Sequence, residues 1–128
     1  MVIRRYTPQD EAALFALLAE EGDDWYDYHG EENRPRYRQA LAGSVVYLAL
    51  ENQVLCGFCR CREDFGFGVY VFDLLVRKDC RGKNIGGQLI AQVKSDFAGQ
   101  TLYVNSDVDG YYQKLGYLKV GSIFEVMP

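Results

Sequence analysis

The sequence lacks any apolar run long enough to cross a membrane, and its first ten residues, MVIRRYTPQD, contain no apolar signal region. We therefore expect no membrane partner and a cytoplasmic location. Basic residues are in the minority: the net charge is −4, whereas nucleic-acid-binding proteins usually present a basic face. We expect no nucleic-acid partner. Histidine occurs once, as His29, so the sequence offers no second histidine with which to hold a metal.

Cysteine is present but does not indicate a metal site. Cys56 and Cys59 have the CxxC spacing of redox and metal sites. The surrounding residues read as a strand, in which side chains three positions apart point to opposite faces, so these two thiols are not expected to meet. Cys59 and Cys61 share a face, but two thiols alone make a poor zinc site. We expect reduced structural thiols, as in most cytosolic chains, and no metal.

The remaining composition is typical of a globular protein, with 48% apolar and 25% charged residues among 128. We expect one domain spanning residues 1–128. Hydrophobic periodicity predicts strands at residues 2–6, 45–50, 54–62, 69–76, 101–104 and 117–127. It predicts helices at residues 8–21, 34–42, 85–97 and 108–115. The acidic connection at residues 23–32 is expected to be irregular. This order predicts a mixed α/β fold with antiparallel hairpins.

A glycine-rich segment, Arg81–Gly87, stands between a predicted strand and a predicted helix. Free N–H groups at a helix N-terminus, together with the helix dipole, can hold an anion. The segment contains neither the GxxxxGKS/T pattern of a P-loop nor the GxGxxG pattern of a dinucleotide site. Taken alone, it is equally consistent with a tight turn before an ordinary helix.

A second segment, Asn105–Tyr117, reads NSDVDGYYQKLGY and predicts a short helix after a strand. Tyr111 and Tyr112 are adjacent and therefore point in different directions. One can pack while the other faces a cleft. The alternative is that both tyrosines simply pack, with their hydroxyl groups at the surface.

Together the two segments resemble the GCN5-related N-acetyltransferase (GNAT) superfamily, over nearly the whole chain. The family pattern Q/R-x-x-G-x-G/A matches Arg81 to Gly86, except that Asn84 stands where a glycine is usual. Asparagine is the non-glycine residue that best tolerates left-handed backbone geometry, so the turn can survive. The family also has an asparagine followed seven residues later by a tyrosine, as Asn105 and Tyr112 are. The resemblance implies a mixed, mostly antiparallel sheet, splayed between its fourth and fifth strands and flanked by helices.

The resemblance also implies acetyl-CoA as co-substrate, direct transfer of its acetyl group to a primary amine in a ternary complex, and no metal. Tyr112 corresponds in position to the family's general acid. Asp73, on the fourth strand, is the candidate general base; the alternative is an ordinary solvated or hydrogen-bonded strand residue. The implied acetyl-CoA contacts are Leu75, Val76, Arg81, Gly82, Lys83, Asn84, Ile85, Gly86, Gly87, Asn105, Tyr112 and Lys114.

The connection between the first two helices often borders the acceptor site in this family, and here it is acidic and aromatic. Carboxylates attract a protonated amine, and aromatic faces hold cations. We therefore expect a small cationic acceptor. The alternative is a solvated acidic loop with Trp25 or Tyr26 anchored in the core. The candidate acceptor-binding residues are Asp23, Asp24, Trp25, Tyr26 and Asp27.

The chain departs from the family at its C-terminus, where residues 117–128 leave room for one long strand or two very short ones. The missing strand would leave an unpaired sheet edge, which favours a homodimer. Two other functions remain open: an acyl-CoA-binding sensor without turnover, and transfer to a protein N-terminus or lysine.

Overall fold

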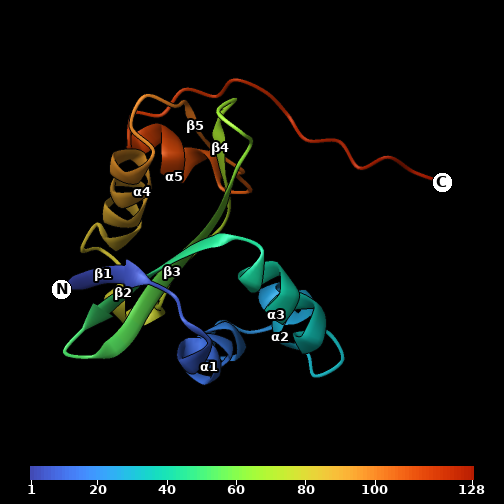
Figure 1. Cartoon of the computed structure of the whole chain (residues 1–128), viewed down its shortest axis with the longest axis vertical. Helices are drawn as coiled ribbons and strands as arrows, with labels where there is room; N and C mark the ends of the chain where they lie inside the picture. The colour runs from blue at the N-terminus through green and yellow to red at the C-terminus, as the bar shows by residue number, and fades with distance from the viewer.

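The computed structural model describes residues 1–128, which form one sheet with helices packed on it (Figure 1). The strands are β1 (Val2–Arg5), β2 (Val45–Glu51), β3 (Val54–Glu63), β4 (Val69–Val76) and β5 (Leu102–Val104). The helices are α1 (Glu11–Glu21), α2 (Tyr26–His29), α3 (Arg34–Ala42), α4 (Ile85–Asp96) and α5 (Asp109–Lys114), with 3₁₀ turns η1 (Pro8–Asp10), η2 (Asp23–Trp25) and η3 (Lys78–Cys80). The predicted mixed α/β class is confirmed. None of these helices has the length and apolar character needed to cross a membrane.

The strands lie side by side in the order β1-β2-β3-β4-β5. The pairings from β1 to β4 are antiparallel, whereas β4 and β5 run parallel. β5 pairs only with Val69–Val71 of β4, and the last bond between the two segments is donated by the Asn105 amide to the Val71 carbonyl at 2.8 Å. Beyond Val71 the two chains separate. The predicted splay between the fourth and fifth strands is confirmed.

Helices cover the two faces of the sheet and divide the core into two clusters. Leu89 and Val93 of α4 pack with Cys59 on one face. Leu14 of α1 packs with Phe58 on the other, where α3 also contributes. Phe58 and Cys59 are neighbours in β3 and point to opposite faces, as the alternation of a strand requires.

A β-bulge at Phe72 changes which face the β4 side chains point to. Val71 and Asp73 pair with consecutive residues of β3, so Phe72 between them has no partner there. Val71 belongs to the cluster under α4, whereas Leu75 belongs to the cluster under α1 and α3. Asp73, two positions before Leu75, is therefore buried on the α1 and α3 face. Regular alternation would have placed it beneath α4 with Val71.

The cysteine arrangement corrects the sequence expectation. A second β-bulge, at Cys56, puts this residue in the same cluster as Cys59 and Cys61. The prediction that Cys56 and Cys59 point to opposite faces is wrong, because an extra residue in a strand reverses its alternation. All four cysteines are buried, and their thiols are free.

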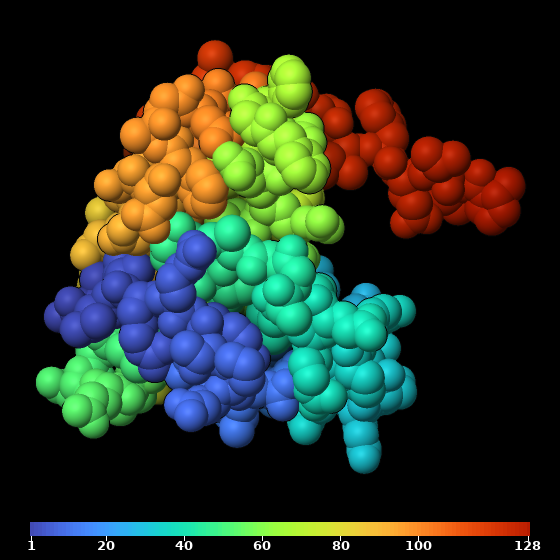
Figure 2. Space-filling view, viewed as in Figure 1, coloured from blue at the N-terminus to red at the C-terminus, as the bar shows by residue number.

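The predicted strand at residues 117–127 is also wrong. Residues 117–128 form no helix or strand, and all except Tyr117 are exposed. We call residues 117–128 the tail; its distal end extends away from the body of the molecule (Figures 1 and 2). Alternating apolar residues form a strand only where a neighbouring edge pairs with them, and here the tail pairs with none.

Candidate functional site

The glycine-rich turn before α4 presents a row of free backbone N–H groups. None of the N–H groups of residues 82–87 donates to another backbone carbonyl; the first that does is that of Gln88, to the Asn84 carbonyl at 3.0 Å. Gly82 and Asn84 are left-handed, with φ of 86° and 58°. The predicted left-handed geometry of Asn84 is confirmed. Free N–H groups at the positive end of a helix form a site for an anion.

The two basic side chains of this turn have partners within the protein. Arg81 Nη2 lies 2.6 Å from Glu21 Oε1, and Arg81 Nε donates to the Val76 carbonyl at 3.0 Å. Lys83 Nζ lies 3.3 Å from Glu51 Oε2. The Arg81 and Lys83 side chains are 49% and 54% exposed. Because exposed ion pairs contribute only about 0–1 kcal/mol, either side chain can turn toward a bound anion at small cost.

Asn105 and the tyrosines of α5 stand at the gap between β4 and β5. Asn105 directly follows β5, and Tyr112 is half-buried with its ring stacked on Tyr117 at a centroid distance of 6.1 Å. Burial raises the pKa of Tyr112, so its hydroxyl group stays protonated and able to donate. The hydroxyl group of Tyr111 lies against Gly86 in the first turn of α4. The two tyrosines do point in different directions.

A cavity of about 870 Å³ follows the outer edge of β5. It is bounded by α4, α5 and the first part of the tail, and both Asn105 and Tyr112 line it. The structure thus brings together two residues that the sequence assigned to one site. Among the turn residues only Gly87 reaches this cavity.

Asp73 is buried, with 3% of its side chain exposed, and it is paired. Its Oδ2 accepts a hydrogen bond from the Tyr37 hydroxyl group at 2.7 Å and lies 2.5 Å from Arg60 Nε. Arg60 also donates to Ser44 Oγ at 3.2 Å, and its guanidinium carbon lies 5.6 Å from the centroid of Phe72. Burial, reinforced by the charge of Asp73, raises the pKa of Tyr37. Asp73 therefore ties β3 and α3 to the bulge of β4, and its role as general base stays a prediction.

The acidic segment lies apart from this cavity. Residues 23–29 form η2 and α2 rather than the irregular connection that was expected. Trp25 packs against Phe58 at a centroid distance of 6.0 Å and against Tyr28 at 5.4 Å, so it belongs to the core. No residue of this segment lines the cavity along β5. The other predicted acceptor residues, all exposed, are Asp23, Asp24, Tyr26 and Asp27.

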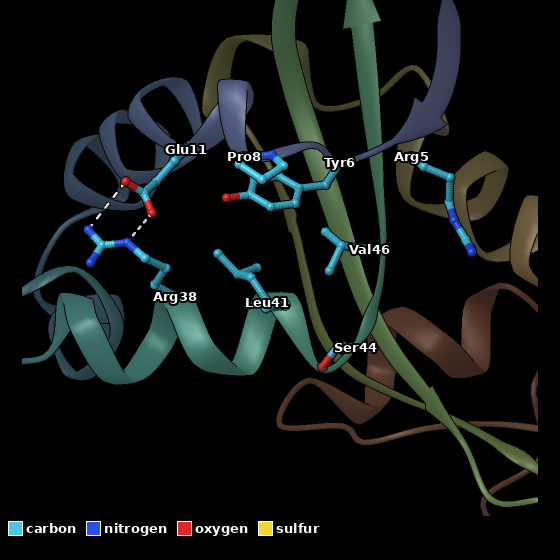
Figure 3. Close-up of a pocket in the computed structure, with 9 residues that line it drawn as sticks. Arg5, Tyr6, Pro8, Glu11, Arg38, Leu41, Ser44 and Val46 are labelled. Atoms are coloured by element: carbon cyan, nitrogen blue, oxygen red, sulfur yellow. Dashed lines mark hydrogen bonds and ion pairs between the residues drawn. The ribbon is translucent and has the colours of Figure 1, made fainter.

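A second cavity, of about 480 Å³, lies between the end of β1, α1 and α3 (Figure 3). Glu11 and Arg38 form an ion pair on one side of it, with Arg38 Nη2 3.3 Å from Glu11 Oε2. Tyr6, Leu41 and Val46 line the remainder. No predicted site residue reaches this cavity, so the candidate site is the glycine turn together with the β5 edge.

The contact between Tyr111 and Gly86 leads to a testable prediction. A Cβ atom at Gly86 would lie 2.4 Å from the Tyr111 hydroxyl oxygen, and the next atoms are 3.5 and 3.6 Å away. Gly86→Ala is therefore expected to lower the free energy of unfolding by about 1–3 kcal/mol, as overpacking does. Tyr111→Phe in the same chain is expected to remove most of that loss, because it removes only the clashing oxygen. Urea denaturation of the four combinations measures this coupling.

Gly110→Ala is the matched control, because a Cβ there would have no neighbour within 4 Å. It is expected to be neutral or to stabilise the helix by about 0.5–1 kcal/mol. Equal losses for Gly86→Ala with and without the Tyr111 hydroxyl group would contradict the contact.

Sequence reasoning missed Arg60 and Tyr37 as partners of Asp73, and Phe72 as a lining residue of the cavity along β5. Arg60 and Tyr37 lie on other elements, so no local pattern connects them with Asp73. One signal was available for Arg60: a charged residue in an otherwise apolar strand usually has a buried partner. Phe72 read as an ordinary strand residue, because a bulge leaves no mark in the sequence.

Comparison with known proteins agrees with this geometry. The model of the acetyltransferase (GNAT) family matches residues 12–117. The uncharacterized N-acetyltransferase ycf52 of Porphyra purpurea is 34% identical over 105 residues, which cover 73% of this chain. The chain spans 60% of the length of that relative.

Solved structures share the fold. An aminoglycoside acetyltransferase, HMB0005, from an uncultured soil metagenomic sample superimposes with a TM-score of 0.76 at 25% identity, covering 99% of this chain and 97% of its own. The aminoglycoside N-acetyltransferase AAC(6')-Iy, solved in complex with CoA, gives a TM-score of 0.77 at 14% identity, covering 99% and 93%. Because the family model covers most of the chain, and the splayed sheet, glycine turn and tyrosine helix lie within it, this protein belongs to the acetyltransferase (GNAT) family.

Proposed function

We propose that the protein transfers the acetyl group of acetyl-CoA to a primary amine. The observation that carries the proposal is the row of free N–H groups at residues 82–87, whose last member, Gly87, lines the same cavity as Asn105 and Tyr112. A phosphate-binding turn next to an open strand end and a protonated phenol suits a ligand with a pyrophosphate at one end and a reactive group at the other.

The chain offers contacts along the length of such a ligand. The N–H groups of residues 82–87 would hold the pyrophosphate, and the side chains of Arg81 and Lys83 would turn from their carboxylates to add charge. The half of β4 that lacks β5 as a partner, at Leu75 and Val76, would bind the pantetheine arm. Lys114, exposed on α5, would add a further positive charge.

Acetyl-CoA supplies an activated thioester when bound. The residues around it would accept a proton from the amine and donate one to the leaving thiolate. The amine nitrogen forms a bond to the acetyl carbonyl carbon, the carbon–sulfur bond breaks, and the amine loses a proton to a base. A backbone N–H near Val76 would stabilise the oxyanion. Tyr112 would give its proton to the departing thiolate. Asp73 remains the candidate base, although its pairing with Arg60 also gives it a structural task.

For the acceptor we propose a small molecule that is cationic before it reacts. The exposed carboxylates Asp23, Asp24 and Asp27 would raise its local concentration without lining the cavity. An acyl-CoA sensor without turnover and an acetyltransferase for protein amino groups are the alternatives. The cytoplasmic location and the homodimer stay predictions from the sequence.

Release of the CoA thiol from acetyl-CoA, measured against a panel of amines, tests the proposal. We expect release with at least one primary amine, and none with the corresponding tertiary amine, which has no N–H to exchange for the acetyl group. CoA binding measured by calorimetry, without thiol release on any amine, would favour the sensor instead.

A further inference from the structure

Three aromatic side chains form a stacked row on the open end of the sheet. Tyr70 and Tyr103 are register partners in β4 and β5, and their rings lie 5.0 Å apart at 22°. The rings of Tyr70 and Phe72 lie 6.4 Å apart at 19°. We call Tyr70, Phe72 and Tyr103 the aromatic ladder. Tyr70 and Phe72 remain 37% and 39% exposed, and because their rings are stacked side by side they form one continuous apolar surface rather than scattered exposed residues.

The ladder lies on the sheet face opposite α4. Val69 and Val71, which flank Tyr70, pack in the cluster under α4, as do the neighbours of Tyr103 in β5. Alternation then directs the ladder to the other face. On that face α1 packs mainly on β3 and α3 on β2, and Tyr70 and Phe72 stay partly exposed.

The ladder is continuous with the proposed active site. All its members line the same cavity as Asn105 and Tyr112. Phe72, at one end of the ladder, is the bulge residue, beside the point where β4 parts from β5. A molecule lying on the ladder therefore has one end at the gap where the acetyl group would be transferred. The apolar tail residues Leu118, Val120 and Ile123 line the other side of this cavity.

The charges around the cavity do not suit a polycation. Asp109 lies 3.2 Å from Lys119, which neutralises the one carboxylate in the lining. Lys94, the remaining charged residue there, donates to the Gln100 carbonyl at 2.9 Å. A second or third ammonium group of an acceptor would thus find no free carboxylate in the cavity.

We propose that the acceptor is a primary amine with an aromatic or flat apolar body, which lies on the aromatic ladder while its nitrogen points into the β4–β5 gap. The proposal rests on the proposed function and names the substrate class of that site. Ring edges of the ladder can meet the face of an acceptor ring, an arrangement that aromatic pairs favour. The apolar surroundings also disfavour the ammonium form and so promote loss of the proton that blocks attack. Transfer itself forms one nitrogen–carbon bond and breaks one carbon–sulfur bond, with the proton of the amine leaving to the base and that of Tyr112 going to sulfur.

Steady-state kinetics with matched amines tests this inference. For the unaltered protein we expect kcat/KM for 2-phenylethylamine to exceed that for n-butylamine by about 10-fold or more, the effect of burying one ring. Spermidine is expected to be a poorer substrate than 2-phenylethylamine. Tyr70→Ala is expected to reduce the ratio of the two kcat/KM values by about 10-fold, because it removes the middle ring of the ladder.

Phe65→Ala is the control, since Phe65 is 93% exposed and lies outside the cavity; the ratio should not change. Phe72→Leu serves as a second variant, and an unaltered dissociation constant for CoA shows that each variant is folded. A preference for spermidine would overturn the inference about the acceptor, as would a ratio of the two kcat/KM values that neither Tyr70→Ala nor Phe72→Leu changes. Neither result would contradict the proposed acetyltransferase activity. Absence of thiol release with every amine would overturn the proposed function itself.

Discussion

Tyr112→Phe is expected to lower kcat by about 100-fold or more with the acetyl acceptor that the protein uses, which is the usual effect of removing a general acid. The phenylalanine ring keeps the stacking on Tyr117 and the packing on Tyr111. Only the proton donor is lost, so the departing thiolate must take its proton from water. We expect KM for acetyl-CoA to change little, because the hydroxyl group acts late in the reaction. Initial rates from thiol release measure both constants.

The pH dependence of kcat provides a second test of Tyr112 as the general acid. Burial holds the pKa of Tyr112 above its ordinary value of about 10, so the protonated, active form persists through neutral and mildly alkaline pH. The unaltered enzyme should therefore show no fall in kcat from this group below about pH 10. Tyr117→Phe is the matched control, because Tyr117 carries the partner ring of the stack. Equal losses of kcat in the two variants would show that removing either hydroxyl group disturbs the site, and would contradict a specific role of Tyr112 as proton donor.

Asp73→Ala is expected to reduce the free energy of unfolding by about 3–5 kcal/mol, the cost of leaving a buried charge without its partner. Arg60 would keep its positive charge in a site where 14% of its side chain is exposed. The Tyr37 hydroxyl group would also lose its acceptor. Urea denaturation measures the loss, monitored by the fluorescence of Trp25, which packs in the same core cluster as Tyr37.

A double variant separates the charge from the shape of the site. Replacing Asp73 by leucine and Arg60 by methionine together is expected to cost much less than Asp73→Ala, because no unpaired charge remains. Asp73→Asn distinguishes the two roles considered for this residue. Loss of kcat with stability retained supports a general base, whereas loss of stability with kcat retained in the folded fraction identifies a structural anchor.

Much of the fold could be predicted, because the signals that carried it are local. The predicted helix at residues 34–42 and strand at residues 69–76 have the bounds of α3 and β4. The left-handed Asn84 could be predicted as well, since backbone sterics restrict that geometry to few residue types. The resemblance to the family assigned Asn105 and Tyr112 to one site, and the structure places both at one cavity, because they lie on a short stretch of strand, turn and helix.

What could not be predicted depends on how distant segments meet. The bulges at Cys56 and Phe72 exist only in the pairing of two strands, and they decided which face Cys56 and Asp73 point to. The strand expected in the tail did not form, because the tail pairs with no strand of the sheet, not even with the open edge of β5.

The sequence by itself determined the glycine turn, the tyrosine helix and the family, because these depend on residues close together in the chain. Only the tertiary structure decided that Asp73 is paired with Arg60 and that Tyr70, Phe72 and Tyr103 stack beside the proposed active site. The physical reason is that strand register and burial are set by cooperative packing of the whole sheet, which no single stretch of sequence specifies.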